Sequence, residues 1–323
     1  MIDFMRTENS STPLKTSLNF LSHIMRMMPK NIRKTLWWWD KMYSRIGGGR
    51  FCADPEIDNQ WPSGLQKPIS SIYGYRLHLD LRNWADRRAY FSGTYYQTDI
   101  LDLLSKIIHP SDQFVDIGAN VGFITLHAAQ LVGPHGRVVA CEPNPAMLFR
   151  LHDHIKINAF EGRVTVVESA FGEVASTAIL HVPENHPGMA TFTSDEGVSV
   201  EVPVAKGDDA LFMISKATPL IIRIDVEGFE QKTLSGLMET LEHPEIILVI
   251  EVTDHMLKRV GDSAAGIYEF LKAKGFEGFL FKSEQKRFNT ELNISSCNET
   301  EEVEQYDAIF AKSKSQIINR LLK

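Results

Sequence analysis

A chain of 323 residues with 43% hydrophobic residues is long enough for one large globular domain with an appendage, or for two modest domains. The net charge of −7 is uneven: residues 1–50 carry nine basic and three acidic side chains, so the rest carries −13, which argues against nucleic-acid binding. Cys52, Cys141 and Cys297 are widely spaced, which argues against a disulfide framework or structural zinc and fits a cytoplasmic setting.

Residues 14–43 are predicted to form two amphipathic helices, because apolar side chains recur at steps of three and four on both sides of Pro29. Basic side chains lie between them, so this segment either packs as a helical cap or makes peripheral contact with an anionic membrane or a lipid-linked acceptor. The glycines at 47–49 end this extension, which we place at residues 1–50. The chain has no apolar run of the roughly 20 residues that a membrane helix needs, and its first thirty residues lack a signal-peptide pattern.

Short apolar runs alternate with helical patterns from about residue 75 onward. Tyr75–Leu81 is predicted to be a short strand or the arm of a hairpin, and Tyr90–Leu104 a turn that leads into a helix. Further helices are expected near 122–132 and 145–158, and strands at Phe114–Ile117, Arg137–Cys141, Val164–Val167, Leu220–Ile224, Ile246–Ile250, Phe276–Phe281 and Tyr306–Ala311. This alternation predicts an α/β fold with helices on both faces of a mainly parallel sheet. Residues 51–110 would link the extension to the core and begin the domain, and residues 111–323 would form the core.

The region near 171–209 departs from this alternation. Thr177–Val182 and Val198–Val204 are predicted to form a hairpin, joined by a loop that contains His186-Pro187-Gly188. An insertion near the carboxyl ends of the strands is well placed to shape a pocket for an acceptor.

The run Phe114–Phe123 is the strongest functional signal, because an apolar strand passes through a glycine-containing turn into a helix. Glycine lets the backbone bend sharply and lets a ligand approach, and the free N–H groups at a helix N-terminus suit a carboxylate. Asp116 ends the strand and is expected near an amine. The predicted cofactor-binding residues of this turn are Asp116, Gly118, Ala119, Asn120 and Gly122.

The ends of the next two strands supply further polar groups. Glu142 can accept both hydroxyl protons of a ribose, with Asn144 beside it, and Glu168 and Ser169 are expected near the adenine. The turn reads GxNxG rather than GxGxxG, so it lacks the second glycine that admits a pyrophosphate. The expected cofactor is therefore S-adenosyl-L-methionine, and an NAD-binding oxidoreductase is the less favoured alternative.

Three segments resemble the FkbM family of S-adenosylmethionine-dependent methyltransferases: the turn 116–122, the Glu142-Pro143-Asn144 turn, and the stretch 223–230, RIDVEGFE, which is similar to the family signature KIDVEGAE. The resemblance extends from about Tyr75 to Ala311, with Arg223 and Phe229 as departures. It implies a class I methyltransferase Rossmann-like sheet of seven strands with the last antiparallel. It also implies O-methylation of an acceptor such as a small molecule, glycan, glycolipid or natural product.

Methyl transfer to an alcohol needs an aligned oxygen and a base. Asp225, at the end of the fourth strand, is the first candidate, followed by Glu251 and His255 near the end of the fifth, while Glu227 is expected to point elsewhere if its turn tightens. The predicted site contains no metal, although Asp225, Glu251 and Asp254 form an alternative set of ligands for a divalent ion. A non-catalytic module that keeps the fold is the second functional alternative. The sequence does not indicate an oligomeric state.

Overall fold

A computed structural model describes residues 64–322, apart from 66, 184–187, 189, 193–196, 286–289 and 298–304. The chain divides into two compact units, residues 1–98 and 99–323. The boundary expected at residue 110 lies between a helix and a strand of the second unit, and the expected domain limits stay a prediction. The predicted helices at 14–43, and with them the possible membrane contact, lie outside the described residues. Among the helices that are described, none combines the length and apolar character needed to span a membrane.

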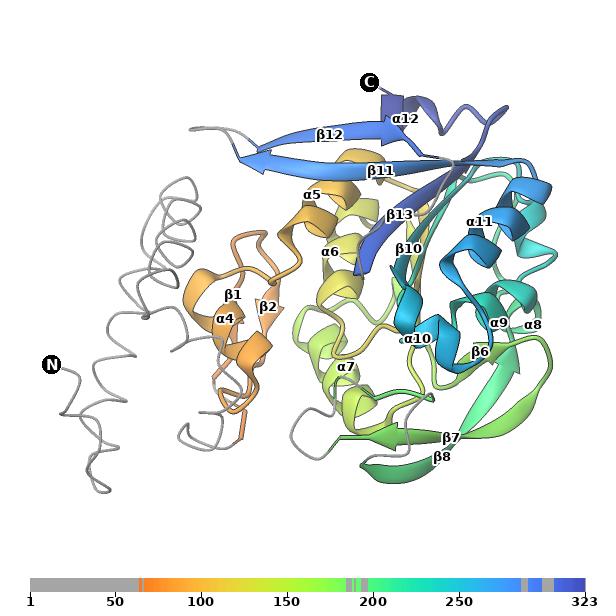
Figure 1. The fold of residues 1–323 in the computed structure, drawn as a ribbon. Coiled ribbons are helices and arrows are strands. Elements are labelled where there is room, and N and C mark those ends of the chain that lie inside the picture. The colour runs from red at the N-terminus through yellow and green to blue at the C-terminus, as the bar shows by residue number, and fades with distance from the viewer. Residues whose placement is uncertain are drawn as a thin grey trace, which may run out of the picture. The chain divides into compact units, whose positions relative to one another are not determined.

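The second unit is built around an eight-stranded mixed sheet, in the order β12-β11-β13-β10-β9-β3-β4-β5 (Figure 1). Its strands are β3 (Gln113–Ile117), β4 (Arg137–Cys141), β5 (Val164–Val167), β9 (Leu220–Ile224), β10 (Ile246–Thr253), β11 (Phe276–Gln285), β12 (Thr290–Ser296) and β13 (Gln305–Lys312). The central strands β3, β9 and β10 are buried along their whole length, which explains their nearly continuous apolar sequences.

Seven of these strands have the arrangement expected of a class I methyltransferase. Strands β5, β4, β3, β9 and β10 are parallel neighbours, and β13 is antiparallel to β10. Strand β11 is antiparallel to β13, so only the last strand of the seven runs against the others. The fold class is therefore confirmed. The sheet also has an eighth strand, β12, which pairs with β11 as an edge hairpin and which its largely polar sequence did not indicate.

Helices cover both faces of this sheet. Residues of α9 and α11 share one hydrophobic core with the apolar side chains of β3, β9, β10 and β13, while α6 packs on β3 and β4. The helices of this unit are α5 (Thr98–Ile107), α6 (Phe123–Val132), α7 (Pro145–Ile157), α8 (Gly207–Ala210), α9 (Glu230–Ser235), α10 (Asp254–Arg259), α11 (Ala264–Ala273) and α12 (Asn319–Leu322), with a 3-10 turn at Thr240–Glu242. The helices expected near 122–132 and 145–158 are α6 and α7.

The predicted hairpin insertion is confirmed as β7 (Ser176–Val182) and β8 (Val198–Lys206), which pair antiparallel. A short strand that the sequence did not indicate, β6 (Ala170–Gly172), pairs parallel with β8, so these strands form a separate three-stranded sheet. Figure 1 shows β7 and β8 extending away from the main sheet on the side of α7.

The first unit has little regular structure among its described residues. Strands β1 (Ile69–Ser70) and β2 (Arg76–Leu77) pair antiparallel, so the strand expected at Tyr75–Leu81 is much shorter than predicted. Helix α4 (Trp84–Ser92) was not expected; Asn83 caps its N-terminus by accepting from the amides of Ala85 and Asp86.

Candidate functional site

Charged side chains form a row across one face of the main sheet. Asp116 on β3 is the register partner of Arg223 on β9, and Glu251 on β10 is the partner of Asp307 on β13. Asp225 lies two residues beyond Arg223 and therefore faces the same side. The alternate residues of these strands belong to the hydrophobic core on the opposite face. The register of four strands thus places four carboxylates and one guanidinium together.

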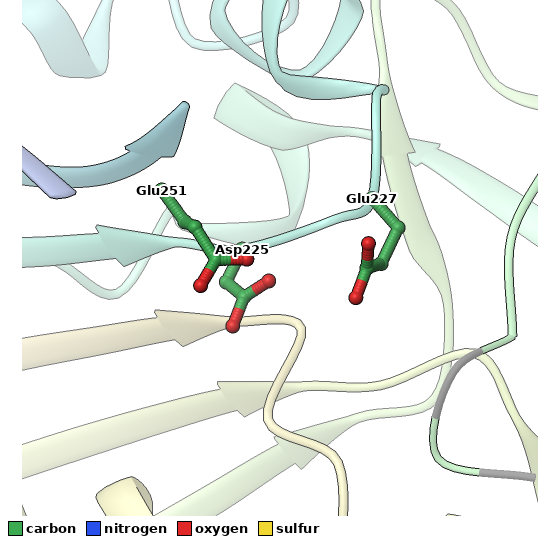
Figure 2. A group of neighbouring side chains, drawn as sticks. All are labelled: Asp225, Glu227 and Glu251. Atoms are coloured by element: carbon green, nitrogen blue, oxygen red, sulfur yellow. The ribbon is translucent and has the colours of Figure 1, made fainter. Parts of the chain in front are cut away.

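Three carboxylates converge at the carboxyl ends of β9 and β10 (Figure 2). One oxygen from each of Asp225, Glu227 and Glu251 lies within 4.8 Å of the others. Glu227 reaches this group because its backbone is left-handed, with φ of 52°, followed by Gly228 at 97°. The expectation that Glu227 points elsewhere is therefore wrong: the tight turn directs its side chain back toward Asp225.

Arg223 is the cation that faces this row. Its Nη1 lies 3.4 Å from Oδ1 of Asp116, and its Nη2 donates to Oδ2 of Asp225. Both pairs are largely buried, and Arg223 stands where the family signature has lysine. A guanidinium can bind two carboxylates from one rigid plane, which a lysine ammonium does less well.

Burial and neighbouring negative charge raise the pKa values of the carboxyls around Arg223. Burial and the charges of Asp225 and Asp307 raise the pKa of Glu251 to about 10. Burial, with Asp225 and Glu230 nearby, raises the pKa of Glu227 to about 7. The pKa of Glu230 and that of Asp307 are each raised to about 7, mainly by burial. Glu251 therefore holds a proton at neutral pH, whereas Glu227 is poised to gain or lose one.

These raised pKa values predict how stability depends on pH. Between the ordinary carboxyl pKa of 4.5 and a folded-state value near 7, the folded protein binds more protons than the unfolded chain, so the free energy of unfolding falls as pH rises. Each such group contributes at most about 1.4 kcal/mol per pH unit. Glu251 extends the fall toward pH 10. We expect the free energy of unfolding in urea to decline in this way as pH rises, measured with a chelator present so that no bound metal ion contributes. In Glu251→Gln, the decline above pH 7 should be smaller. An unchanged slope in that variant would contradict the prediction.

Asp116 lies inside the protein and is fully buried. Its Oδ2 accepts from the hydroxyl of Thr125 on α6 at 2.6 Å, and its other oxygen faces Arg223. Burial raises its pKa. Both oxygens thus have protein partners, and the expected position of Asp116 near an amine stays a prediction.

Each amide of the turn 118–122 donates within the protein. The N–H groups of Gly118 and Ala119 donate to the carbonyl of Cys141, and that of Gly122 to the carbonyl of Ala119. The amide of Asn120 donates to Glu142, and Val121 donates to the side chain of Asn120. The amides expected to receive a cofactor carboxylate are therefore engaged in holding the turn.

The glycines of this turn are required by packing. Gly118 has φ of +88°, and a Cβ there would lie 1.8 Å from the carbonyl oxygen of Asp225. Gly122 has φ of +93°, and its Cβ would lie 2.6 Å from Cδ1 of Leu151 on α7. Gly118 thus lets the ends of β3 and β9 approach closely, an effect separate from the ligand access expected from the sequence.

Glu142 joins the two turns at the ends of β3 and β4. Its Oε2 accepts from the amide of Asn120 and its Oε1 from the amide of Asn144, both at 2.8 Å. Each carboxylate oxygen has a second lone pair, so Glu142 can still accept from the hydroxyls of a ribose. Asn144 caps α7 by accepting from the amide of Ala146, so its side chain has a structural role.

The end of β5 offers a buried polar atom without a partner. Oγ of Ser169 has no hydrogen-bond partner among the residues that the structure describes, although Ser169 is only 6% exposed. Glu168 is exposed and pairs with His152 at 2.9 Å. A ligand that reaches from Glu142 toward β5 would satisfy Ser169, so the residues present fit a nucleoside-bearing cofactor.

The carboxylate group differs from the alternative set of cation ligands that the sequence offered, Asp225, Glu251 and Asp254. Asp225 and Glu251 do meet, but the third member is Glu227 instead of Asp254. Asp254 begins α10, accepts from the amide of Ala264 and pairs with Lys258. His255 is exposed on α10 and is not part of the group. Glu227 joins the group because of its positive φ, and its residue type did not predict that backbone conformation.

The insertion contacts both motif turns. Nδ2 of Asn120 donates to the carbonyl of Gly188 at 2.9 Å, and the hydroxyl of Thr191 donates to the carbonyl of Glu227 at 3.1 Å. The rings of Phe192 and Phe229 lie 4.8 Å apart between centroids. The described residues of the loop between β7 and β8 therefore reach the turns that carry Asn120 and Glu227.

Comparison with known protein families identifies the family of this chain. The family model of the methyltransferase FkbM domain matches residues 116–277, from Asp116 to the start of β11. The chain belongs to the FkbM methyltransferase family. It is an S-adenosylmethionine-dependent methyltransferase, and its cofactor is S-adenosyl-L-methionine. The family is one of methyltransferases, which removes the support for the NAD-binding alternative.

Two curated proteins are similar to parts of this FkbM methyltransferase. Hexuronic acid methyltransferase AglP of Haloferax volcanii is 28% identical over 156 residues, which are 47% of this chain and 61% of AglP. Ribosomal protein L11 methyltransferase of Chloroflexus aurantiacus is 31% identical over 72 residues, 22% of this chain and 21% of that protein. The chain thus spans less than two thirds of either relative.

Solved structures of similar chains include two methyltransferases. The precorrin-6Y C5,15-methyltransferase of Geobacter metallireducens is 18% identical, with a TM-score of 0.39 over 68% of this chain and 89% of that one. The O-methyltransferase of Bacillus cereus in complex with SAH is 16% identical, with a TM-score of 0.39 over 66% of this chain and 79% of that one.

Glu142 provides a direct test of how the FkbM methyltransferase holds its cofactor. Glu142→Gln removes a charged acceptor and sets an amide NH2 against a backbone N–H, so we expect S-adenosylmethionine to bind roughly 10- to 100-fold more weakly. Calorimetric titration measures this, with Glu161→Gln, at an exposed position before β5, as the matched control. Equal affinities in the two variants would show that Glu142 does not contact the ribose.

Proposed function

We propose that this FkbM methyltransferase transfers the methyl group to a hydroxyl oxygen of a glycan, glycolipid or natural-product acceptor. The observation that carries the proposal is the group of Asp225, Glu227 and Glu251 at the strand ends. Alcohols are poor nucleophiles until their proton begins to leave, and carboxylates near the reacting oxygen can receive that proton. The name of the relative AglP, hexuronic acid methyltransferase, supports a sugar-containing acceptor.

Within this group we assign the base to Glu227. Asp225 is paired with Arg223, and Glu251 has a pKa of about 10, so it keeps its proton at neutral pH. Glu227 has a pKa of about 7, which suits a group that must be ionised before transfer and protonated after it. The negative charge of Asp225 would raise the pKa of Glu227 and the positive charge of Arg223 would lower it. His255, exposed on α10, stays the alternative base.

The roles of the remaining residues follow from their positions. S-adenosylmethionine supplies an electrophilic methyl on a sulfonium, and transfer forms a C–O bond as the C–S bond breaks and sulfur takes the electron pair. Glu142 and Ser169 would hold the nucleoside, and the loop that carries Thr191 and Phe192 would limit access for water and acceptor. Aligning the oxygen with the methyl is the main task of such a site.

The experiment uses the full chain with S-adenosylmethionine carrying a 13C-labelled methyl group. It is incubated with small-molecule, glycan and lipid extracts, and products are read by mass spectrometry and by the carbon shift of the label. An O-methyl signal on a sugar or other hydroxyl carrier supports the proposal. A labelled nitrogen or carbon overturns it, and binding of S-adenosylmethionine without any transfer supports the alternative of a non-catalytic module.

A further inference from the structure

The carboxylate group at the ends of β9 and β10 has the composition of a cation site. We propose that Asp225, Glu227 and Glu251 bind one divalent cation, of the Mg²⁺ or Mn²⁺ type. All three ligand atoms are oxygens and lie within 4.8 Å of one another (Figure 2). Hard divalent cations prefer such carboxylate oxygens, and Mg²⁺ is commonly held by one or two of them with water completing the shell.

Two buried carboxylate oxygens beside the group lack partners. Oε2 of Glu230 and Oδ1 of Asp307 have no hydrogen-bond partner among the described residues. Glu230 is 2% exposed, and its other oxygen accepts from the amide of Gly228, which folds its carboxylate under the turn that carries Glu227. Asp307 is the strand partner of Glu251 and faces the same side. Buried acceptors without donors are costly unless a ligand satisfies them.

The distribution of charge leads to the same conclusion. Arg223 already binds Asp116 and Asp225, so its single positive charge is shared by two carboxylates. Glu227, Glu230, Glu251 and Asp307 remain around it, each acted on by the negative charge of Asp225. A divalent ion between Asp225, Glu227 and Glu251 would release the proton that Glu251 holds in its absence and would offset the negative charge of the group, with Glu230 and Asp307 accepting from its bound waters.

The cation would also assist the proposed methyl transfer by activating the acceptor hydroxyl. This role of the cation rests on the proposed function. An acceptor hydroxyl bound to a divalent ion loses its proton more readily. A carboxylate that binds the ion through one oxygen has a second oxygen for that proton, so Glu227 can do both. Cation binding itself requires neither acceptor nor methyl transfer, so it is tested separately from the O-methylation.

The test is a Mn²⁺ titration of the full chain after chelator treatment, followed by the electron paramagnetic resonance signal of free Mn²⁺. We expect one saturable site per chain. Glu227→Gln and Glu251→Gln should each weaken binding by roughly tenfold or more. Glu239→Gln is the matched control, because that side chain is 80% exposed and lies 4.0 Å from Lys206, outside the group. Circular dichroism checks that each variant folds.

Three results would overturn the site. The first is no saturable Mn²⁺ binding by the wild-type chain, a measurement that stands even if a variant fails to fold. The second is equal binding by wild type, Glu227→Gln and Glu251→Gln. The third is complete displacement of Mn²⁺ by S-adenosylmethionine alone, because the group would then serve the positive charge of the cofactor. Mn²⁺ binding that persists with the cofactor present, and that excess Mg²⁺ competes away, supports the proposal.

Discussion

Methyl transfer by Glu227→Gln is expected to fall by a factor of about 10² to 10⁴, the usual contribution of a positioned base. The glutamine keeps the shape of the side chain but loses both its ability to take a proton and the negative charge that would bind the proposed cation. Because burial and the charges of Asp225 and Glu230 raise the pKa of Glu227 to about 7, the rate of the cation-free wild-type protein should rise with pH up to about 7 and then level off. A cation bound to Glu227 would shift this rise to lower pH. In the variant, this rise should disappear.

The measurement is kcat against pH with a labelled acceptor, together with calorimetric titration of S-adenosylmethionine. Binding of the cofactor should change little, because Glu142 and Ser169, which are proposed to hold it, lie at other strand ends. The control is Glu239→Gln, an exposed glutamate outside the group. If the variant keeps both the full rate and the pH dependence, Glu227 is not the base, and His255 or Asp225 becomes the candidate.

Gly118→Ala is expected to cost about 3 kcal/mol or more of folding stability, at the upper end of the range for overpacked sites. A Cβ at this position would lie 1.8 Å from the carbonyl oxygen of Asp225 and 2.9 Å from its carbonyl carbon, and backbone atoms cannot turn aside as a flexible side chain can. The positive φ of +88° adds strain. Relief requires the ends of β3 and β9 to separate, which would also displace the Asp225 carboxylate.

Gly133→Ala separates the two causes. Gly133 also has a positive φ, +69°, but nothing lies within 4 Å of an added Cβ, so we expect only the cost of backbone strain, about 1 to 3 kcal/mol. Denaturant unfolding of both variants gives the difference, and calorimetry shows whether Gly118→Ala still binds S-adenosylmethionine. Equal stabilities of the two variants would mean that strain alone accounts for the glycine at 118.

Local patterns were enough to predict most of the main sheet. The strands at 114–117, 137–141 and 220–224 are short apolar runs buried on both faces, so their sequences are almost continuous hydrophobic stretches. The glycine turn and the RIDVEGFE stretch were enough to indicate the family. Strand β12 was missed because its sequence, TELNISS, is mostly polar, with Leu292 and Ile294 as its apolar residues.

The sequence by itself therefore determined the fold class and the cofactor, because the patterns that indicate them are formed by residues near one another in the chain. Tertiary structure decided which side chains meet. Asp307 reaches Glu251 only through the antiparallel register of β13 on β10, and Glu227 reaches Asp225 only through a left-handed turn. It also decided that Asp116 is buried against Thr125 and Arg223. Such pairings depend on packing between distant segments, which no local pattern of residue types encodes.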